Sequence, residues 1–303
     1  MKKIAKFILK GILRLLGSLP LKVHYRLARF LAWLAGDVLR YRRDVVMTNI
    51  SRCFPEKNYW ELAGIRKGFY QHFGEVVAEA IWFGACRNPK RLRDAHIVEM
   101  KNPEELSRLA EVSPSCMILF SHTGNWELIG GIENYIPAGA MPPITEENVC
   151  VVYRKLSSKI WDEIMNENRT APLKARSEFK GYLETEKIVR YIYEHKDEMK
   201  FYNLCTDQRP YFESAGYITL DFFGQPVRIM AGGAAVAHKF HMSVTYLKMH
   251  RVSQGHYTYE YITICDDASQ MSVEDIMRKY YDLVEQEIKE QPENYLWSHH
   301  RFA

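Results

Sequence analysis

One short segment carries a histidine and a carboxylate at a spacing that suits general-base chemistry. It reads Ser-His-Thr-Gly-Asn-Trp-Glu over residues 121–127 and continues an apolar run, Cys116–Ser121, that is typical of a buried strand. Gly124 permits a tight turn, after which a helix begins. If the helix folds back, Glu127 holds one ring N–H of His122 and leaves the other nitrogen free to take a proton from a hydroxyl. The spacing alone is weak evidence, because such pairs often arise by accident.

Two further polar residues follow predicted strands, and so belong to the same edge of a parallel sheet as His122. Arg154 follows Val149–Tyr153, and Asp207 follows Phe201–Thr206. Ligands bind beyond the carboxyl ends of such strands. We expect Arg154 to donate to an oxyanion or to bind a phosphate, and Asp207 to orient Arg154 or a sugar hydroxyl. The simpler alternatives are a surface arginine at a strand end and an aspartate that forms a turn.

The elements that must position these residues alternate between strand and helix beyond residue 114. This pattern predicts an α/β fold, with a mainly parallel central sheet flanked by helices on both faces. The expected strands are Ser115–Ser121, Val149–Tyr153, Phe201–Thr206, Tyr217–Phe223 and Ser243–Leu247, with Tyr257–Ile264 as an edge strand. The expected helices are Glu127–Tyr135, Leu156–Asn168, Phe179–His195, Ala231–Phe240 and Val273–Glu290.

A longer helix is expected earlier in the chain. Asn58 followed by Glu61 is typical of a capped helix start, and apolar residues keep helical spacing to about Phe83. The helix is expected to pack on the core. Glu75 and Glu79 are expected on its solvated face, with a role near a lipid entry as the alternative.

The N-terminus is basic. Residues 1–43 contain eleven Lys or Arg and one acid, whereas the other residues contain 30 bases and 36 acids. Lys6, Lys10 and Arg14 share one helical face, and the opposite face is apolar. We expect residues 1–40 to form an amphipathic helical segment that lies in a membrane interface, with its cations toward anionic headgroups.

Several other partners and sites are not expected. Neither N-terminal apolar run reaches the ~20 residues of a spanning helix, and nothing resembles a nucleic-acid reading element. The alternative for the basic helix is packing on its own domain.

The six cysteines lack CxxC spacing and are expected to be reduced, mostly buried thiols, none beside a plausible base. His238 and His241 lack a third ligand, so neither a metal nor a cofactor is expected.

Residues 121–127 closely resemble the first motif of the late acyltransferases of lipid A biosynthesis, the lauroyl and myristoyl acyltransferase type. This family is a branch of the lysophospholipid acyltransferase superfamily. Other segments resemble its further motifs in a consistent order, from about residue 20 to the end. They are Tyr41-Arg42-Arg43 with Asn49 and Phe54-Pro55-Glu56, Val152-Tyr153-Arg154-Lys155, Thr206-Asp207-Gln208, Phe222-Phe223-Gly224 and Trp297-Ser298-His299-His300-Arg301-Phe302. The chain departs from the family in its basic N-terminus and at Met230-Ala231.

The resemblance implies a glycerophosphate-acyltransferase-like fold, with an acyltransferase domain over residues 41–303. It implies direct transfer of a fatty acyl chain from an acyl carrier protein or coenzyme A thioester to a hydroxyl of a lipid A precursor. It also implies that no covalent acyl-enzyme forms, which agrees with the absence of a GxSxG sequence. His122 and Glu127 are the catalytic pair it implies, and the substrate-binding residues are Arg154, Asp207, Asn125 and Gly124. The implied location is the cytoplasmic face of the inner membrane.

Three alternatives remain at this point. The same chemistry could act on an aminolipid, a phosphoglycolipid or a lysophospholipid. A non-catalytic membrane-associated binding protein would tolerate His122→Ala, but would lose function when Lys6, Lys10 and Arg14 lose their charge. A thioesterase would release free fatty acid without any acceptor.

Overall fold

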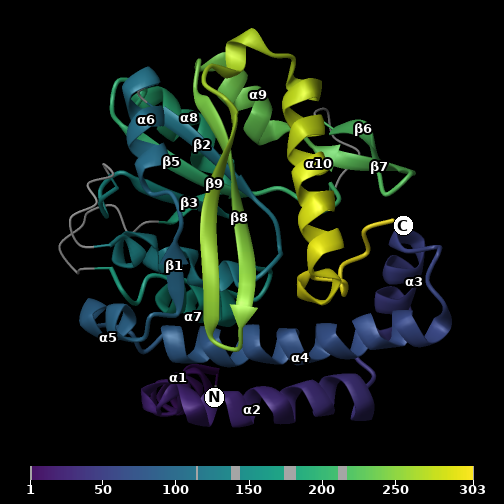
Figure 1. Cartoon of the computed structure of the whole chain (residues 1–303). Coiled ribbons are helices and arrows are strands. Elements are labelled where there is room, and N and C mark those ends of the chain that lie inside the picture. Colours follow the sequence, from purple (N-terminus) through teal and green to yellow (C-terminus); the bar gives the residue numbers. More distant parts are fainter. Residues whose placement is uncertain (1, 114, 138–143, 174–181, 211–216, 303) are drawn as a thin grey trace.

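The computed structural model describes residues 2–113, 115–137, 144–173, 182–210 and 217–302. Within these ranges a seven-stranded sheet has the order β1-β9-β8-β2-β5-β3-β4, and β6 and β7 form a separate hairpin (Figure 1). The strands are β1 Val98–Met100, β2 Ser115–Phe120, β3 Val149–Tyr153, β4 Tyr182–Glu184, β5 Lys200–Cys205, β6 Tyr217–Phe222, β7 Gln225–Met230, β8 Ser243–Ser253 and β9 His256–Cys265. The neighbouring strands from β8 to β4 pair in parallel, whereas β9 runs antiparallel to β8. The predicted α/β class with a mainly parallel sheet is confirmed.

Helices cover both faces of this sheet because β2 is apolar on both of its faces. Met117 and Leu119 point into one buried cluster, whereas Cys116, Ile118 and Phe120 point into the other. The first cluster includes residues of α8, α9 and α10, and the second includes residues of α6 and the 3₁₀ helix Trp126–Tyr135. The helices are α1 Lys2–Ser18, α2 Leu21–Trp33, α3 Arg43–Cys53, α4 Tyr59–Phe83, α5 Pro89–Asp94, α6 Glu104–Val112, α7 Lys159–Arg169, α8 Ile188–Glu194, α9 Gly232–Lys239 and α10 Val273–Glu290.

The long helix α4 begins where the sequence predicts. The Asn58 side chain accepts hydrogen bonds from Trp60 and Glu61 backbone N–H groups, and the Glu61 carboxylate accepts one from the Asn58 N–H at 2.9 Å. The expectation of a solvated face at Glu75 and Glu79 is wrong, because these side chains are buried. They lie beneath β8 and β9, whose Arg251 and Tyr257 they bind.

Three other expectations about secondary structure are corrected. The strand predicted at Tyr217–Phe223 exists, but it belongs to the hairpin and not to the central sheet. The predicted edge strand is β9, which lies between β8 and β1, so β1 forms that edge. The predicted helix Phe179–His195 includes a strand, β4, before α8 begins at Ile188. Residues 179–181 lie outside the described residues.

The N-terminal helices α1 and α2 lie against α4 (Figure 1). Glycines allow the close approach: a Cβ at Gly74 would meet the Ala28 carbonyl oxygen at 2.4 Å, and one at Gly17 would meet the Ile81 carbonyl oxygen at 2.6 Å. In the described part of the chain, no helix is both long enough and apolar enough to span a membrane.

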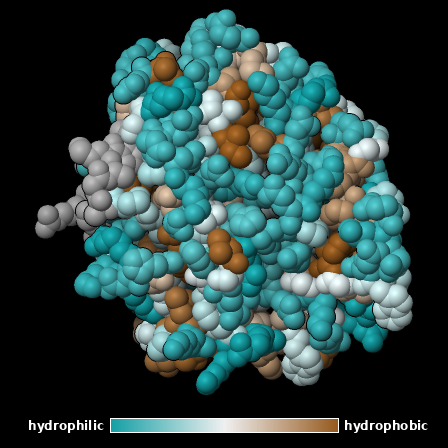
Figure 2. All heavy atoms as spheres, in the orientation of Figure 1, coloured by the Kyte–Doolittle hydropathy of each residue, from teal (hydrophilic) through white to brown (hydrophobic). Residues whose placement is uncertain are grey.

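The basic face of α1 is directed differently from the prediction. Lys6 pairs with Glu163 of α7, and the Lys10 Nζ lies 2.5 Å from Glu167 Oε1. Arg14 lies 3.7 Å from the same glutamate. These cations therefore face α7 of the same chain. Apolar side chains of α1 are exposed to solvent, and Figure 2 shows apolar side chains at the lower left, over this helix. We call Phe7, Ile8, Ile12 and Leu15, which are 50% to 79% exposed, the apolar face of α1.

The C-terminal segment is held by α3 and the residue that precedes it. Asn49 Nδ2 donates to the carbonyl oxygens of Trp297 and His299 at 2.8 and 2.6 Å, and Arg42 donates to that of Ser298 at 2.8 Å. Residues 42–49 and 297–299, far apart in the sequence, are therefore in direct contact.

Candidate active site

The register of the two central strands places His122 beside Asp207. In the parallel pair β2–β5, Phe120 lies opposite Cys205. Both strands end at this point, so the residues two positions further on, His122 and Asp207, also face each other. His122 Nδ1 lies 2.7 Å from Asp207 Oδ1, and the His122 backbone N–H donates to Oδ2 of the same carboxylate at 3.2 Å. One aspartate thus fixes both the ring and the backbone of the histidine.

The electrostatics of this pair determine which ring nitrogen carries the proton. Burial by itself would raise the pKa of Asp207, but the attraction and hydrogen bonds of His122 outweigh burial and hold that pKa well below its usual range. The carboxylate is therefore ionised and can only accept hydrogen bonds. It follows that His122 donates through Nδ1–H, which leaves the lone pair on Nε2.

The expected contact between His122 and Glu127 is not made. Among the hydrogen bonds and ion pairs of the described residues, Glu127 binds Arg169 at the end of α7, through Arg169 Nε at 2.7 Å and Nη2 at 2.6 Å. Burial lowers the pKa of Arg169, but Glu127 more than compensates, so the guanidinium stays charged. Asp207 holds the histidine in place of Glu127.

Gly124 and Asn125 shape the turn between β2 and the following 3₁₀ helix. Gly124 has φ +53°, and a Cβ there would lie 2.2 Å from the Met249 carbonyl oxygen, so only glycine fits. The buried Asn125 side chain donates to Glu79 Oε2 at 2.6 Å and accepts from the Glu127 backbone N–H at 3.1 Å. His72 Nε2 lies 2.7 Å from the Gly124 carbonyl oxygen. Gly124 and Asn125 were predicted to bind substrate. They lie in the turn and do not line the cavity described below.

Residues from the C-terminal part of the chain hold the same strand ends from the other side. Tyr280 of α10 donates to the Phe120 carbonyl oxygen at 2.8 Å, and Tyr281 donates to that of Thr206 at 3.2 Å. The Leu296 N–H donates to the His122 carbonyl oxygen at 3.0 Å. The ends of β2 and β5 are therefore fixed by α10 and the segment that follows it.

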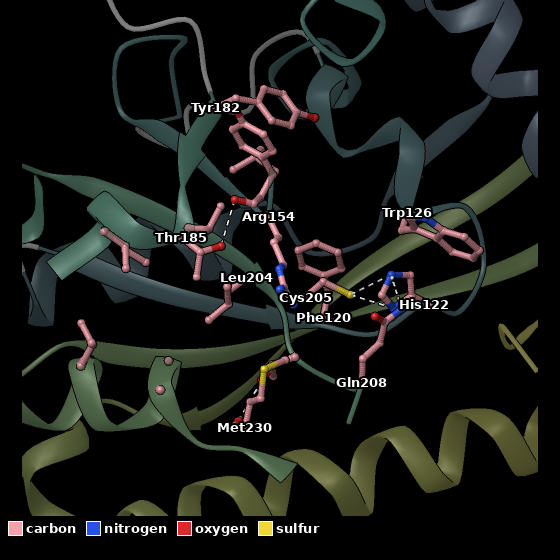
Figure 3. Close-up of a pocket in the computed structure, with 18 of the residues that line it drawn as sticks. Phe120, His122, Trp126, Arg154, Tyr182, Thr185, Leu204, Cys205, Gln208 and Met230 are labelled. Atoms are coloured by element: carbon pink, nitrogen blue, oxygen red, sulfur yellow. Dashed lines mark hydrogen bonds between the residues drawn. The ribbon is translucent and has the colours of Figure 1, made fainter. Parts of the chain in front are cut away.

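A cavity of about 450 Å³ opens at this edge of the sheet. Its lining is mostly apolar, with a few polar groups, as is common in sites for small or lipid-like ligands. Figure 3 shows His122, Cys205 and Gln208 gathered at one end of it, with Arg154, Thr185 and Tyr182 along the remainder. The lining residues are Phe120, His122, Trp126, Val151, Val152, Tyr153, Arg154, Arg169, Tyr182, Thr185, Ile188, Val189, Leu204, Cys205, Thr206, Gln208, Met230, Gly232, Gly233 and Val236.

Of the predicted substrate-binding residues Arg154 and Asp207, the first lines the cavity and the second does not. Arg154 lines it, at the end of β3 and two strands away from His122. Asp207, 2% exposed, lies behind His122 and does not line it. Asp207 was predicted to orient Arg154 or a sugar hydroxyl, and the partner that the structure gives its carboxylate is His122.

Cys205 corrects the expectation that no cysteine lies beside a base. Its Sγ is 3.1 Å from His122 Nδ1 and 3.3 Å from Asp207 Oδ1. Burial, reinforced by Asp207, raises the pKa of this thiol well above its usual value, so it is protonated. In the described residues all six cysteines are free, as predicted, and four of them are buried.

The arrangement suits proton abstraction from a hydroxyl. His122 lines the cavity, and with the ring proton on Nδ1 its Nε2 lone pair accepts from the Gln208 side-chain amide, whose Nε2 lies 3.3 Å away. The Trp126 ring packs edge-on against the imidazole, with centroids 5.1 Å apart. An ionised aspartate behind the ring favours the imidazolium that forms when the base takes a proton.

Four residues of this site carry no role in the sequence prediction: Trp126, Arg169, Cys205 and Gln208. Trp126 and Gln208 stand inside the motifs that contain His122 and Asp207, and this membership is the signal that could have identified them. Cys205 is the last residue but one of the predicted strand Phe201–Thr206, close to the edge of the sheet. Arg169 ends a helix on a surface-like charged stretch, and nothing in the sequence indicates that it reaches Glu127.

One comparison with known proteins covers the full length of the chain. A family model described as bacterial lipid A biosynthesis acyltransferase matches residues 1–303. No curated protein matches at a significant level.

Proposed function

Because the chain belongs to the bacterial lipid A biosynthesis acyltransferases and is therefore an O-acyltransferase, we propose that it moves a fatty acyl chain from a thioester to a hydroxyl of a lipid A precursor. His122 is the general base of this proposal, and Asp207 orients it. The observation that carries the mechanism is the 2.7 Å hydrogen bond from His122 Nδ1 to a buried, ionised Asp207, at the end of an apolar cavity.

The steps follow from the protonation of this pair. The acceptor hydroxyl lies against His122 Nε2 and gives up its proton as its oxygen attacks the thioester carbonyl carbon. The tetrahedral intermediate collapses, the carbon–sulfur bond breaks, and the imidazolium returns the proton to the leaving thiolate. Asp207 stabilises the imidazolium in between. No enzyme nucleophile is needed, and the protonated Cys205 thiol is a poor one.

The charged groups of the cavity support an anionic substrate. Arg154 and Arg169 both line it, and guanidinium groups bind phosphate oxygens in a bidentate manner. We assign Arg154 to a phosphate of the acceptor or to the oxyanion. Glu127 binds Arg169 with both carboxylate oxygens, so its role in this proposal is to hold that cation at the cavity wall.

We place the protein at the cytoplasmic face of the inner membrane, attached through its N-terminal helices. The apolar face of α1 supports this location, together with exposed Phe30 and Trp33 of α2. Lys22 and Arg26 are exposed on the same helix and suit an anionic lipid surface. Apolar burial in the interface is the main contribution, because Lys6 and Lys10 already pair with α7.

The test combines donor and acceptor in one assay. Purified protein in detergent is given an acyl carrier protein thioester or a coenzyme A thioester, with either a lipid A precursor or a lysophospholipid. We expect transfer to the lipid A precursor. We also expect faster transfer from the acyl carrier protein thioester than from the coenzyme A thioester, because the carrier protein is acidic and suits the basic N-terminal region. Transfer only to the lysophospholipid would overturn the acceptor, and fatty acid release without transfer would overturn the acyl transfer itself.

A further inference from the structure

His122, Cys205 and Asp207 offer three different ligand atoms at one point. The atoms are a ring nitrogen, a thiol sulfur and a carboxylate oxygen, and they lie within 4.8 Å of one another. The three separations are 2.7 Å from His122 Nδ1 to Asp207 Oδ1, 3.1 Å from Nδ1 to Cys205 Sγ, and 3.3 Å from Sγ to Oδ1. In the described part of the chain this is the one group of three such side chains.

This donor set suits Zn²⁺ and cations like it. Zinc takes nitrogen, sulfur and oxygen ligands at about 2.0 to 2.3 Å in tetrahedral geometry, which puts ligand atoms roughly 3.3 to 3.6 Å apart. The separation of Cys205 Sγ from Asp207 Oδ1 is already within that range, whereas His122 Nδ1 must move away from Sγ by about 0.2 Å and from Oδ1 by about 0.6 Å. Hard cations such as Mg²⁺ avoid thiolates, so the cysteine selects against them. His122 and Cys205 line the cavity, which gives a cation a path to the site and leaves a fourth position open.

We propose that His122, Cys205 and Asp207 form an inhibitory binding site for Zn²⁺ or a similar borderline-soft divalent cation. The cation takes the Nδ1 lone pair of His122, so the ring proton moves to Nε2, the nitrogen that must accept the substrate proton. It also takes the Asp207 oxygen that otherwise orients the ring. The Cys205 thiol loses its proton to solvent as its thiolate binds the cation. Metal binding stands by itself, whereas the inhibition rests on the proposed function.

Cobalt titration tests the site without turnover, because Co²⁺ is coloured and binds where zinc binds. Reduced protein is titrated with Co²⁺ and then with Zn²⁺. The proposal expects one equivalent of Co²⁺ to give visible tetrahedral bands and a near-ultraviolet thiolate-to-cobalt band, both abolished by Zn²⁺. About one proton should be released per cation. Absence of the thiolate band in the wild type, or proton-free binding, overturns the proposal.

Two variants assign the ligand. Cys205→Ser removes the thiolate and keeps a small polar side chain, so the thiolate band should disappear and the affinity for Zn²⁺ should fall at least about tenfold. Cys265→Ser is the matched control, because this cysteine is also partly buried but lies at the end of β9. Its spectrum should equal that of the wild type. A thiolate band that survives in Cys205→Ser, or is lost in Cys265→Ser, overturns the site.

The inhibition is then measured as a ratio within each protein. Micromolar Zn²⁺ should suppress acyl transfer by the wild type, with recovery after chelation, and Cys205→Ser should retain a larger fraction of its own rate. Equal sensitivity of the two proteins overturns the inhibitory role. A wild type that binds Co²⁺ through a thiolate but transfers no acyl chain contradicts the proposed function and leaves the metal site standing.

Discussion

At the scale of residues, the chemistry depends on which carboxylate serves His122. Spacing along the chain favours Glu127, because it stands on the first turn after the histidine. The strand register favours Asp207, because β2 and β5 end opposite each other and Asp207 contacts the ring at 2.7 Å. The sequence located all of these side chains at one edge of the sheet. It did not settle their pairing, since a β2–β5 register joins residues 85 positions apart and is fixed by packing.

Glu127→Gln separates these two roles. The variant keeps the His122–Asp207 pair, so we expect a smaller loss in kcat than that caused by His122→Ala. Arg169 loses its ionic partner while it is mostly buried, so the free energy of unfolding should fall by about 2 to 5 kcal/mol. Steady-state kinetics and urea denaturation measure the two effects. A kcat as low as that of His122→Ala in a protein of unchanged stability would return the catalytic role to Glu127.

At the scale of elements, α4 is the support of the catalytic turn. Its buried Glu79 accepts from Asn125 Nδ2 at 2.6 Å and from the Tyr257 hydroxyl at 2.8 Å, and its His72 contacts Gly124. The sequence predicted this helix and its cap from Asn58 and Glu61. It could not reveal that Glu79 faces inward, because one acid within an apolar pattern fits a solvated face equally well until β9 is known to cover it.

The pH dependence of stability tests this support. Burial raises the pKa of Glu79 to about 7, despite hydrogen bonds from Tyr257 and Asn125 that lower it, and Glu75 and Arg251 lie nearby. A raised folded-state pKa means that stability is greatest below the unfolded value and is lost as pH rises through about 7. Glu79→Gln keeps an oxygen for both donors but cannot ionise. We expect wild type to lose roughly 3 kcal/mol relative to Glu79→Gln between about pH 4.5 and 8.

Urea denaturation of both proteins at several pH values gives this difference. Glu287, whose pKa is also raised to about 7 by burial, contributes equally to both proteins and cancels. A constant difference across this pH range would show that Glu79 titrates in its ordinary range.

At the scale of the whole molecule, the N-terminal helices give the protein an apolar outer surface next to a polar body. The sequence predicted the amphipathic helix but assigned its cations to lipid headgroups. The structure turns those cations toward Glu163 and Glu167 of α7 and leaves the apolar face of α1 outside. Helical periodicity shows that a helix has two faces, but it does not show which one the remainder of the chain occupies. That depends on acids on α7, more than 140 residues away.

Replacing Phe7 and Leu15 together by serine tests this surface. These side chains are 79% and 69% exposed, and each contributes about 1.5 to 3 kcal/mol when fully buried in an apolar medium. We expect binding to vesicles that contain phosphatidylglycerol to weaken at least about tenfold. Trp60→Ser, on an equally exposed aromatic residue in the first turn of α4, should leave binding unchanged. Equal effects of the two variants in vesicle sedimentation would contradict attachment through α1.

The His122–Asp207 pair is tested most directly by a double-mutant cycle on kcat. Acyl transfer to the lipid A precursor is measured for the wild type, His122→Ala, Asp207→Asn and the double variant. We expect Asp207→Asn to lower kcat about 10³- to 10⁴-fold, because the amide no longer fixes the tautomer of the ring. Removing both residues should cost little more than removing His122 alone, since the aspartate acts through the histidine. Losses that multiply in the double variant, or an Asp207→Asn enzyme with nearly normal kcat, would contradict this account.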